Sequence, residues 1–380
     1  MMQNLKKRRV LCISNVPAPY TVSFYNELGK KMDLTVLFER VFASNRETEW
    51  FCAKENNFKA IYLNGTNFGA EAAICFNVIE YINHSYDLII VANYSSPTGI
   101  LAIAYLRIKR IPFYIHADGG MIVQEPLWKF KLKKLLISSA NGYFSSGKLT
   151  DEYFCYYGKK SSNCCRYPFT SIRKKDLCHK AITSIAKKNS RKSEAIFFED
   201  TVVLFVGSII HRKGVDILIK AAKYLPNSIG INIIGGSPTK ELDNLISSLG
   251  IKNIHFHPFM PFDMIMKYMR AADFFVFPTR YDVWGLVVNE ALGQGLPVIT
   301  TDKCLAGLEL VRDGINGFII PSENPKALAE KILYLHNNPE KLFEMSEQSL
   351  RIIEPYTIEN MADVYANNIE YFCKMQDDNY

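Results

Sequence analysis

Asp282 and Glu290 are two carboxylates, eight positions apart, that could bind a ligand or take part in catalysis. Asp282 follows a strand predicted at 273–277, and Glu290 lies in a helix predicted to begin near Gly285. Open α/β sheets bind ligands beyond the carboxyl ends of their strands, so both side chains can face one crevice. They can hold sugar and ribose hydroxyls, or they can be the acid and base of a glycosidase. Two surface carboxylates near a helix start are the third interpretation.

A second polar segment lies earlier in the same half of the chain. A predicted strand ends at Gly207, the loop after it runs from Ser208 to Arg212 and Lys213, and a helix opens at Gly214. Backbone N–H groups at a helix start, together with adjacent cations, form a cradle for phosphate. A solvated basic loop would show the same residues. Beside this cradle, the carboxylate pair is better explained as a clamp for sugar and ribose hydroxyls.

A third polar cluster, His116, Asp118 and Gly119, follows a strand predicted at 112–115. His and Asp at the carboxyl end of a strand can orient a substrate, and glycine allows a close approach of the backbone to a ligand. A simple turn closed by Asp-Gly is the alternative. The sequence has no Asp-x-Asp, and its histidines show no metal-ligand spacing, so we expect no metal site and no cofactor besides a co-substrate.

The elements that must position these residues alternate between strands and helices in both halves. This rhythm predicts two doubly wound, Rossmann-like α/β domains with parallel sheets. We expect the first domain at residues 1–170, a linker at 171–200 and the second domain at 201–355. Residues 40–70 show no clear period and are expected to be irregular, and a helix is expected at 71–83.

Composition separates the two halves of the chain. The 380 residues are 48% hydrophobic and 22% charged, which is typical of a folded protein with about two domains. Residues 1–190 hold 27 Lys+Arg against 14 Asp+Glu, and residues 191–380 hold 18 against 24. The first half is therefore expected to meet an anionic partner, such as a phosphorylated substrate or a membrane surface. Nucleic acid is disfavoured because no basic patch alternates with stacking aromatic residues.

Nine scattered cysteines without CxxC spacing indicate a reduced compartment. The basic residues near the amino terminus are followed by a short apolar run that Asn15 and Pro17 interrupt, unlike a secretory signal. The longest apolar run, at 100–106, is far below the ~18 residues of a membrane span. We therefore expect a cytoplasmic protein, with peripheral contact to the inner face of the cell membrane as its closest association with lipid.

Residues 126–138 form a basic helical segment that has two interpretations. Trp128, Leu132, Leu135 and Leu136 share one predicted face, and four lysines lie towards the flanks and the opposite side. Such a helix suits reversible adsorption to an anionic membrane surface. The alternative is an ordinary helix whose apolar face packs on the sheet.

The second half resembles the retaining glycosyltransferases of family 4, which have the GT-B fold. The motifs that carry this resemblance occur in the family's order over about 110 residues: Phe205-Val206-Gly207, Arg212-Lys213-Gly214, Phe277-Pro278-Thr279, Asp282-Val283-Trp284-Gly285-Leu286, Asn289-Glu290-Ala291, Gly295-Leu296-Pro297-Val298 and Gly314-Ile315-Asn316-Gly317-Phe318. In the first half, the segments 15–20 and 144–170 resemble bacterial enzymes that build surface polysaccharide.

The resemblance implies two domains facing across a cleft, with an acceptor-side first domain, a donor-binding second domain and a final helix, 356–380, that packs back on the first. The implied reaction moves a sugar from a UDP- or GDP-sugar to a glycan or polyprenyl-diphosphate-linked acceptor. Arg212 and Lys213 would hold the donor diphosphate, Glu290 the ribose hydroxyls, and Asp282 would face the transferred sugar.

The implied catalytic residues are His116, Asp118, Asp282 and Lys213. Other residues are implied to bind substrate: Asn15, Gly119, Gly207, Ser208, Arg212, Trp284, Gly285, Leu286, Val287 and Glu290. This chain departs from the family at Ser208, where Arg is frequent, and at Asp282, where Glu is usual. A nucleotide-sugar epimerase and a non-catalytic nucleotide-sugar-binding protein are the alternative functions.

Overall fold

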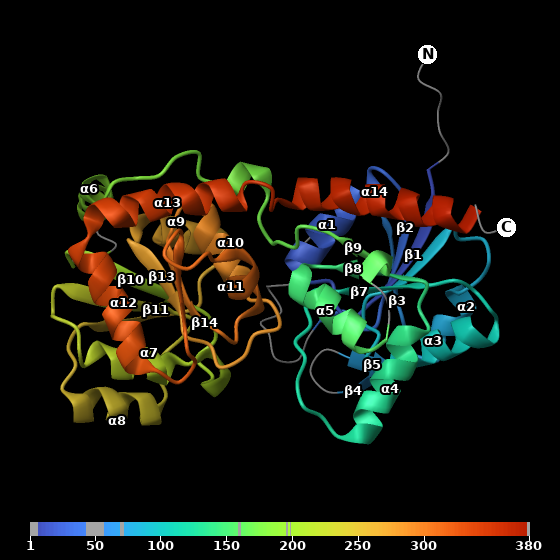
Figure 1. Cartoon of the computed structure of the whole chain (residues 1–380), viewed down its shortest axis with the longest axis horizontal. Coiled ribbons are helices and arrows are strands. Elements are labelled where there is room, and N and C mark those ends of the chain that lie inside the picture. Colours follow the sequence, from blue (N-terminus) through green and yellow to red (C-terminus); the bar gives the residue numbers. More distant parts are fainter. Residues whose placement is uncertain are drawn as a thin grey trace, which may run out of the picture. The chain divides into compact units, whose positions relative to one another are not determined.

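The computed structural model describes residues 7–42, 57–68, 72–158, 161–194, 197 and 199–377, and it divides the chain into two compact units (Figure 1). Unit 1 contains Met1–Ser171 and Thr357–Tyr380, and unit 2 contains Ile172–Tyr356. The end of the chain therefore belongs to the same unit as its beginning. How the two predicted domains face each other stays a prediction.

Unit 1 is built on a seven-stranded sheet with the order β3-β2-β1-β6-β7-β8-β9, in which every pair is parallel. Parallel sheets are covered on both faces, so their strands read as continuous apolar runs, and this made most of them predictable. The bounds are β1 Arg9–Ser14, β2 Asp33–Phe38, β3 Lys59–Tyr62, β6 Leu88–Val91, β7 Tyr114–Ala117, β8 Gly142–Ser145 and β9 Cys164–Arg166.

The helices of unit 1 include the last helix of the chain. They are α1 Pro19–Gly29, α2 Val78–Tyr81, α3 Pro97–Ile108, α4 Leu127–Ser138, α5 Lys148–Tyr156 and α14 Ile358–Asp377. In α14, the ring of Tyr365 stacks on Phe144 with centroids 4.1 Å apart, and Phe372 lies 4.4 Å from Tyr114. A Cβ atom at Gly142 would meet the Phe372 ring at 2.7 Å. Helix α14 is thus part of the core of unit 1.

Two expectations for unit 1 are wrong. The helix expected at 71–83 is a strand, β5 (Ala72–Ile74), followed by the four-residue helix α2. The irregular stretch expected at 40–70 contains β3, the outermost strand of the sheet, and β4 (Thr66–Phe68), which pairs antiparallel with β5. The structure of residues 43–56 and 69–71 lies outside the described part of the chain.

A buried carboxylate explains why a hairpin forms where periodicity favours a helix. Glu39 Oε2 accepts a hydrogen bond of 3.0 Å from the backbone N–H of Ala73, and Glu39 Oε1 accepts from Ser96 Oγ at 2.5 Å and Asn93 Nδ2 at 3.2 Å. Burial raises the pKa of Glu39, and these hydrogen bonds oppose the shift. Contacts that join residues 34 to 57 positions apart leave no mark on local periodicity.

Unit 2 is built on a six-stranded parallel sheet with the order β12-β11-β10-β13-β14-β15. Its strands are β10 Thr201–Val206, β11 Ile229–Ile234, β12 Ile254–His257, β13 Phe274–Phe277, β14 Val298–Thr301 and β15 Gly317–Ile320. The strand predicted at 273–277 corresponds to β13, and the strand predicted to end at Gly207 corresponds to β10.

The helices of unit 2 cover this sheet. They are α6 Ser184–Glu194, α7 Val215–Ala222, α8 Lys240–Leu249, α9 Phe262–Ala271, α10 Leu286–Gly293, α11 Leu305–Leu310, α12 Pro325–Asn337 and α13 Pro339–Ile353. Short 3-10 turns occur at Lys174–Asp176 and His211–Lys213. Among the residues that the structure describes, no helix of either unit has the length and apolarity to cross a bilayer.

Most of the stretch expected to be a linker, 171–200, lies in unit 2 and includes α6. Its residue Arg191 is buried and donates from Nη1 to Asp273 Oδ2 at 2.8 Å, and the same oxygen accepts from the N–H of Val202 at 2.8 Å. Lys187 Nζ donates to the carbonyl of Ala272 at 2.7 Å, and burial lowers the pKa of this lysine to about 8. Two buried cations thus attach α6 to the sheet.

We expect Arg191→Leu to lower the free energy of unfolding of unit 2 by about 3–5 kcal/mol, because it leaves the Asp273 carboxylate buried without its cation. Urea unfolding followed by the fluorescence of Trp284, which is buried in unit 2, measures this. The control is Lys188→Ala in the same helix. Lys188 pairs with Asp200 at the surface, where the loss should stay below about 1 kcal/mol. Equal losses in the two variants would contradict a special role for the buried pair.

Candidate functional site

The loops that follow β10 and β13 meet at one edge of the sheet of unit 2. These strands are neighbours and parallel, so both loops leave at the carboxyl edge. The backbone carbonyl of Arg212 accepts from the N–H of Arg280 at 2.8 Å and from Thr279 Oγ1 at 2.9 Å. Gly214 has φ +71°, and a Cβ atom there would lie 2.0 Å from the carbonyl oxygen of Pro278. Only glycine allows this approach of the two loops.

The meeting of the loops brings together three of the predicted site residues. Lys213 Nζ pairs with Asp282 Oδ2, and Arg212 Nη1 lies 3.1 Å from the same oxygen. The side chains of Lys213 and Asp282 are 15% and 12% exposed, and that of Arg212 is 43% exposed. Lys213 Nζ also lies 4.7 Å from the centroid of the Phe277 ring. The three charges sum to one positive charge at the carboxyl edge of the sheet of unit 2.

Burial lowers the pKa of Lys213, and the attraction of the Asp282 carboxylate opposes that shift. The carboxylate is therefore what helps to keep a buried lysine charged. A cluster with two cations and one carboxylate can attract an anion, and an anion of two or more charges suits it best.

Arg280, which sequence reasoning missed, fixes the turn that carries the cations. Arg280 Nη1 donates to the carbonyl of His211 at 2.6 Å, and its two terminal nitrogens bind Asp216 at 2.7 and 2.9 Å. Burial alone would raise the pKa of Asp216, but hydrogen bonds from Arg280 and Lys220 outweigh it and lower the pKa to about 2. Arg280 and Asp216 are 64 positions apart, so no local sequence signal links them.

Helix α10 begins directly beyond Asp282. Gly285 has φ +99° and a Cβ atom there would lie 3.0 Å from Cys304 Sγ, so the entry to the helix again needs glycine. Leu286 and Val287 form the first turn, where backbone N–H groups have no partner within the helix. Glu290 lies one turn further on and is half-buried. The structure thus presents a helix start, with its partial positive charge, beside the cations.

Trp284, which the resemblance implies to bind substrate, lies just before α10. Its side chain is buried, and its Nε1 donates to Asn289 Oδ1 at 2.8 Å. The backbone carbonyl of Trp284 accepts from the N–H of Ala306 at 2.8 Å. The indole therefore holds the first turn of α10 in the core of unit 2.

Gly207 and Ser208 lie at the end of β10, at the same edge as the cations. A Cβ atom at Gly235, which follows β11, would lie 2.0 Å from the carbonyl oxygen of Gly207. Ser208 is exposed, and its carbonyl accepts from the N–H of Ile210 at 2.9 Å. The ends of β10 and β11 are thus in backbone contact, with the Ser208 side chain turned to solvent.

In unit 1, His116 and Asp118 form a network with two buried tyrosines at the carboxyl end of β7. His116 Nε2 lies 2.6 Å from Asp118 Oδ1, and His116 Nδ1 lies 3.1 Å from the hydroxyl of Tyr365. The ring of Tyr167 stacks on that of His116 at 5.1 Å, and its hydroxyl lies 3.3 Å from Asp118 Oδ1. Burial holds the pKa of both tyrosines well above the usual value, so their hydroxyls stay protonated donors.

This network gives His116 and Asp118 different roles. Both ring nitrogens of His116 have partners and its side chain is 11% exposed, so the imidazole positions its neighbour. The Asp118 side chain is 41% exposed and can reach a substrate. Gly119 follows it and is half-buried. Asn15 follows β1, and because only β6 separates β1 from β7, Asn15 lies at the same edge of the sheet.

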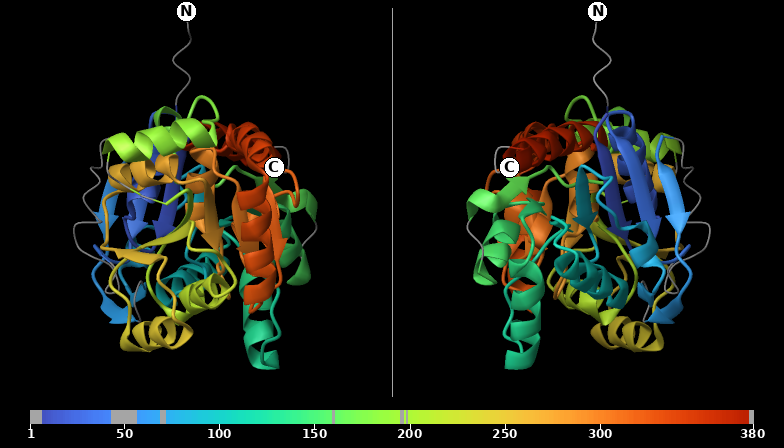
Figure 2. Two further views of the ribbon diagram at one scale, coloured as in Figure 1. Left: turned by 90° about the vertical axis from the view of Figure 1, so that its left-hand side faces the viewer. Right: turned by 90° about the vertical axis from the view of Figure 1, so that its right-hand side faces the viewer.

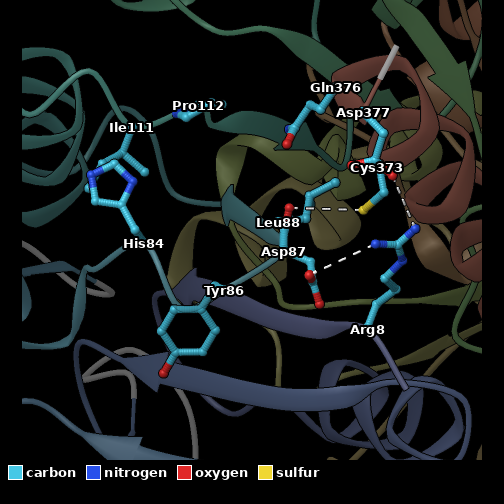
Figure 3. Close-up of a pocket in the computed structure, with 10 residues that line it drawn as sticks. All are labelled: Arg8, His84, Tyr86, Asp87, Leu88, Ile111, Pro112, Cys373, Gln376 and Asp377. Carbon is cyan, nitrogen blue, oxygen red and sulfur yellow. Dashed lines mark hydrogen bonds and ion pairs between the residues drawn. The ribbon is translucent and has the colours of Figure 1, made fainter. Parts of the chain in front are cut away.

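The pocket in Figure 3 lies at the other edge of this sheet, near the amino ends of β1 and β6. It has a volume of about 200 Å³, and Arg8 in its wall pairs with Asp377 at 3.5 Å and with Asp87 at 3.9 Å. These ion pairs join α14 to the start of the sheet. Among the described residues, no group of three or more His, Cys, Asp or Glu side chains could hold a metal ion.

Residues 186–351 match the family described as Glycosyl transferases group 1. The matched residues lie in unit 2. An uncharacterized glycosyltransferase of Methanocaldococcus jannaschii is 38% identical over 139 residues, which is 36% of this chain and 38% of that protein. The lipopolysaccharide glucosyltransferase WaaG of Escherichia coli is 34% identical over 119 residues, 30% of this chain and 31% of WaaG. The chain thus spans well under two thirds of these relatives' length.

Solved structures extend the likeness to the whole fold. Anabaena HepE in complex with UDP has a TM-score of 0.75 over 96% of this chain and 100% of that protein, at 17% identity. An identity this low shows the fold alone. The prediction of two Rossmann-like α/β domains with parallel sheets, as in GT-B glycosyltransferases, is confirmed. The cation cluster of unit 2 lies within the residues that match the family Glycosyl transferases group 1.

We expect Lys213→Ala to lower sugar transfer at least about tenfold, because it removes a charge-assisted contact worth roughly 1.5–3 kcal/mol from the anion. Initial rates of nucleotide release measure the effect, and circular dichroism checks that the fold survives. Lys223→Ala, an exposed lysine just after α7, is the matched control. An unchanged rate for Lys213→Ala would remove this lysine from the site.

We expect Asp118→Asn to lower transfer at least about tenfold, since a positioned carboxylate contributes at least that much as a base or as an acceptor of substrate protons. Tyr365→Phe should lower it less, because that hydroxyl contacts only the far nitrogen of His116. The pH dependence of the rate is measured for both variants. Equal losses with the same pH profile would show that the network acts as a unit and that Asp118 has no separate role.

Proposed function

We propose that this protein is a glycosyltransferase that moves a sugar from a nucleotide-diphosphate donor, a UDP- or GDP-sugar, to a lipid-linked or saccharide acceptor. Unit 2 binds the donor in this proposal, and unit 1 contributes the residues on the acceptor side. The reaction retains the anomeric configuration of the sugar and belongs to the synthesis of a surface polysaccharide.

The observation that carries this proposal is the Arg212–Lys213–Asp282 cluster beside the start of α10. When the glycosidic bond breaks, the nucleoside diphosphate gains negative charge, and fixed cations with a helix start stabilise that charge. HepE was solved in complexes with UDP and with UDP-glucose, which supports a donor of this class. Glu290 would hold the ribose hydroxyls.

Asp282 has two parts in this proposal. Its Oδ2 keeps Lys213 and Arg212 in place, as their contacts with that oxygen indicate. Its second oxygen, Oδ1, would accept a hydrogen bond from a hydroxyl of the transferred sugar. Because the carboxylate is tied to the cations, the sugar and the diphosphate would be fixed relative to each other.

Fewer observations bear on the acceptor than on the nucleotide-sugar donor. The positive balance of residues 1–190 supports an acceptor that carries phosphate, such as a polyprenyl-diphosphate-linked glycan. WaaG is named as a lipopolysaccharide glucosyltransferase, which supports the synthesis of a bacterial surface glycan. Asp118 would orient or deprotonate the acceptor hydroxyl. The proposed place of action is the cytoplasmic side of the cell membrane.

We propose that the transfer needs no metal ion, because Arg212 and Lys213 supply the positive charge that a divalent cation would otherwise bring to a diphosphate. The rate should then be the same in EDTA and in magnesium.

A panel of UDP- and GDP-sugars, tested with and without a bacterial membrane extract, distinguishes the functions. We expect release of nucleotide that depends on the acceptor, at least about tenfold above hydrolysis and lost with Lys213→Ala. Isomerisation of the sugar without an acceptor would indicate the epimerase. Binding of donor without turnover would indicate the non-catalytic protein. The comparisons with known proteins favour neither alternative.

A further inference from the structure

We propose that helix α4 and the end of the loop before it form a docking surface for an anionic lipid bilayer. This proposal rests on the proposed function and adds to it the protein surface that would bind the membrane in which a lipid-linked acceptor is anchored. Six apolar side chains that are 39–77% exposed make up this surface, here called the α4 surface: Ile122, Val123, Leu127, Trp128, Leu132 and Leu135. Figure 2 shows α4 reaching beyond the other helices of unit 1.

The helix buries a different face from the one that sequence spacing favours. Successive residues of an α-helix are 100° apart, so Leu127, Trp128, Leu132 and Leu135 share one arc of the helix. All four are exposed, whereas the two buried residues of α4 are Leu136, which adjoins Leu132 on the helix, and Ile137, on the far side. Of the face predicted from spacing, only Leu136 is buried, and Trp128, Leu132 and Leu135 are exposed. Apolar residues thus extend from the exposed arc to the covered side of the helix, where Leu136 and Ile137 lie.

The lysines divide between these arcs. Lys133 lies on the covered side, 2.8 Å from Glu125 Oε2, with its Nζ 5.7 Å from the centroid of the Tyr157 ring. Lys131 lies within the exposed arc, Lys134 beside it and Lys129 beyond Leu136, and all three are exposed. Three cations are thus placed to meet anionic headgroups while the apolar side chains enter the boundary of the acyl chains.

The composition of α4 favours lipid over another protein or a second copy of this chain. The helix has four lysines and no Asp or Glu, so two copies facing each other would place like charges together. Long lysine side chains can lie along apolar surface and keep their ammonium groups in the headgroup layer. An exposed tryptophan among apolar residues is typical of a membrane interface. With 12 residues the helix is too short to span a bilayer and would lie in its surface.

The connection from β7 to α4 ties this surface to the acceptor side. Residues 118–126 run from Asp118 to the start of the helix and include Ile122 and Val123. Glu125, near the end of this loop, accepts from the hydroxyl of Tyr157 at 2.6 Å and pairs with Lys133, so the loop is fastened to the covered side. Docking of α4 would bring the loop that begins at Asp118 to the lipid surface, where a lipid-linked acceptor has its anchor.

Co-sedimentation of the full chain with vesicles tests this surface. The vesicles are pure phosphatidylcholine or phosphatidylcholine with phosphatidylglycerol. We expect binding to the anionic vesicles that falls at least about tenfold for the Trp128→Ser, Leu132→Ser double variant, because two exposed apolar side chains leave the interface. The control is Ile108→Ser on α3, an exposed apolar residue of the same unit outside the α4 surface. Near-UV circular dichroism confirms that each variant is folded.

A triple variant, Lys129→Gln, Lys131→Gln and Lys134→Gln, tests the charge. It should lose the preference for anionic vesicles, as high salt should in the native chain, whereas the exposed Lys148→Gln on α5 should bind as before. Two results would overturn the proposal. One is a wild-type protein that does not bind the vesicles, and the other is vesicle binding that is unchanged in the double or the triple variant. An equal loss in the control variants would overturn it too.

The vesicle-binding and sugar-transfer experiments distinguish a failure of the docking surface from a failure of the proposed function. Sedimentation needs no turnover, so a protein that binds vesicles through α4 but transfers no sugar keeps the docking surface and loses the proposed function. A protein that releases nucleotide with a membrane extract but shows no affinity for vesicles keeps the function and loses the docking surface.

Discussion

The sharing of one carboxylate between two cations is the interaction on which the candidate site of unit 2 depends. Lys213 is largely buried, and a buried ammonium group without a partner would lose its proton. Asp282 keeps that charge in place, yet it cannot neutralise Arg212 as well. The folded protein can therefore keep the charged lysine largely buried, and the cluster still has a net positive charge that can attract a diphosphate. Without Asp282 the buried Lys213 would lose its proton, and without Lys213 the carboxylate would neutralise Arg212 and leave no net positive charge.

Other parts of unit 2 can be understood as supports for this pair. Gly214 allows the cation-bearing turn to contact the loop after β13, and Arg280 locks the same turn through His211 and Asp216. Unit 1 repeats the parallel architecture but not the charges. At the carboxyl end of β7 it has a network of His116 and two protonated tyrosines that fixes a single exposed carboxylate. One edge is thus suited to an anionic leaving group and the other to a hydroxyl that must give up a proton.

Sequence reasoning reached the fold and the cation cluster because both leave local marks. Buried parallel strands are apolar runs, and Arg212-Lys213-Gly214 directly follows one of them. It missed the β4–β5 hairpin and the docking of α6, since Glu39 and Arg191 act through partners 34 and 82 positions away. Nor did spacing along the chain indicate that the indole of Trp284 is buried and donates to Asn289.

Helix α4 shows the same limit in another form. Its apolar residues extend around most of the helix, and periodicity alone cannot say which of them the rest of unit 1 will cover. Lys133 pairs with Glu125 and lies over the ring of Tyr157, and these contacts hold that side of the helix against the rest of unit 1. Trp128 and its neighbours are exposed as a consequence. A lysine that looks like one of four equal surface charges in the sequence is thus the residue that orients the helix, and the three that remain exposed are the ones available to lipid.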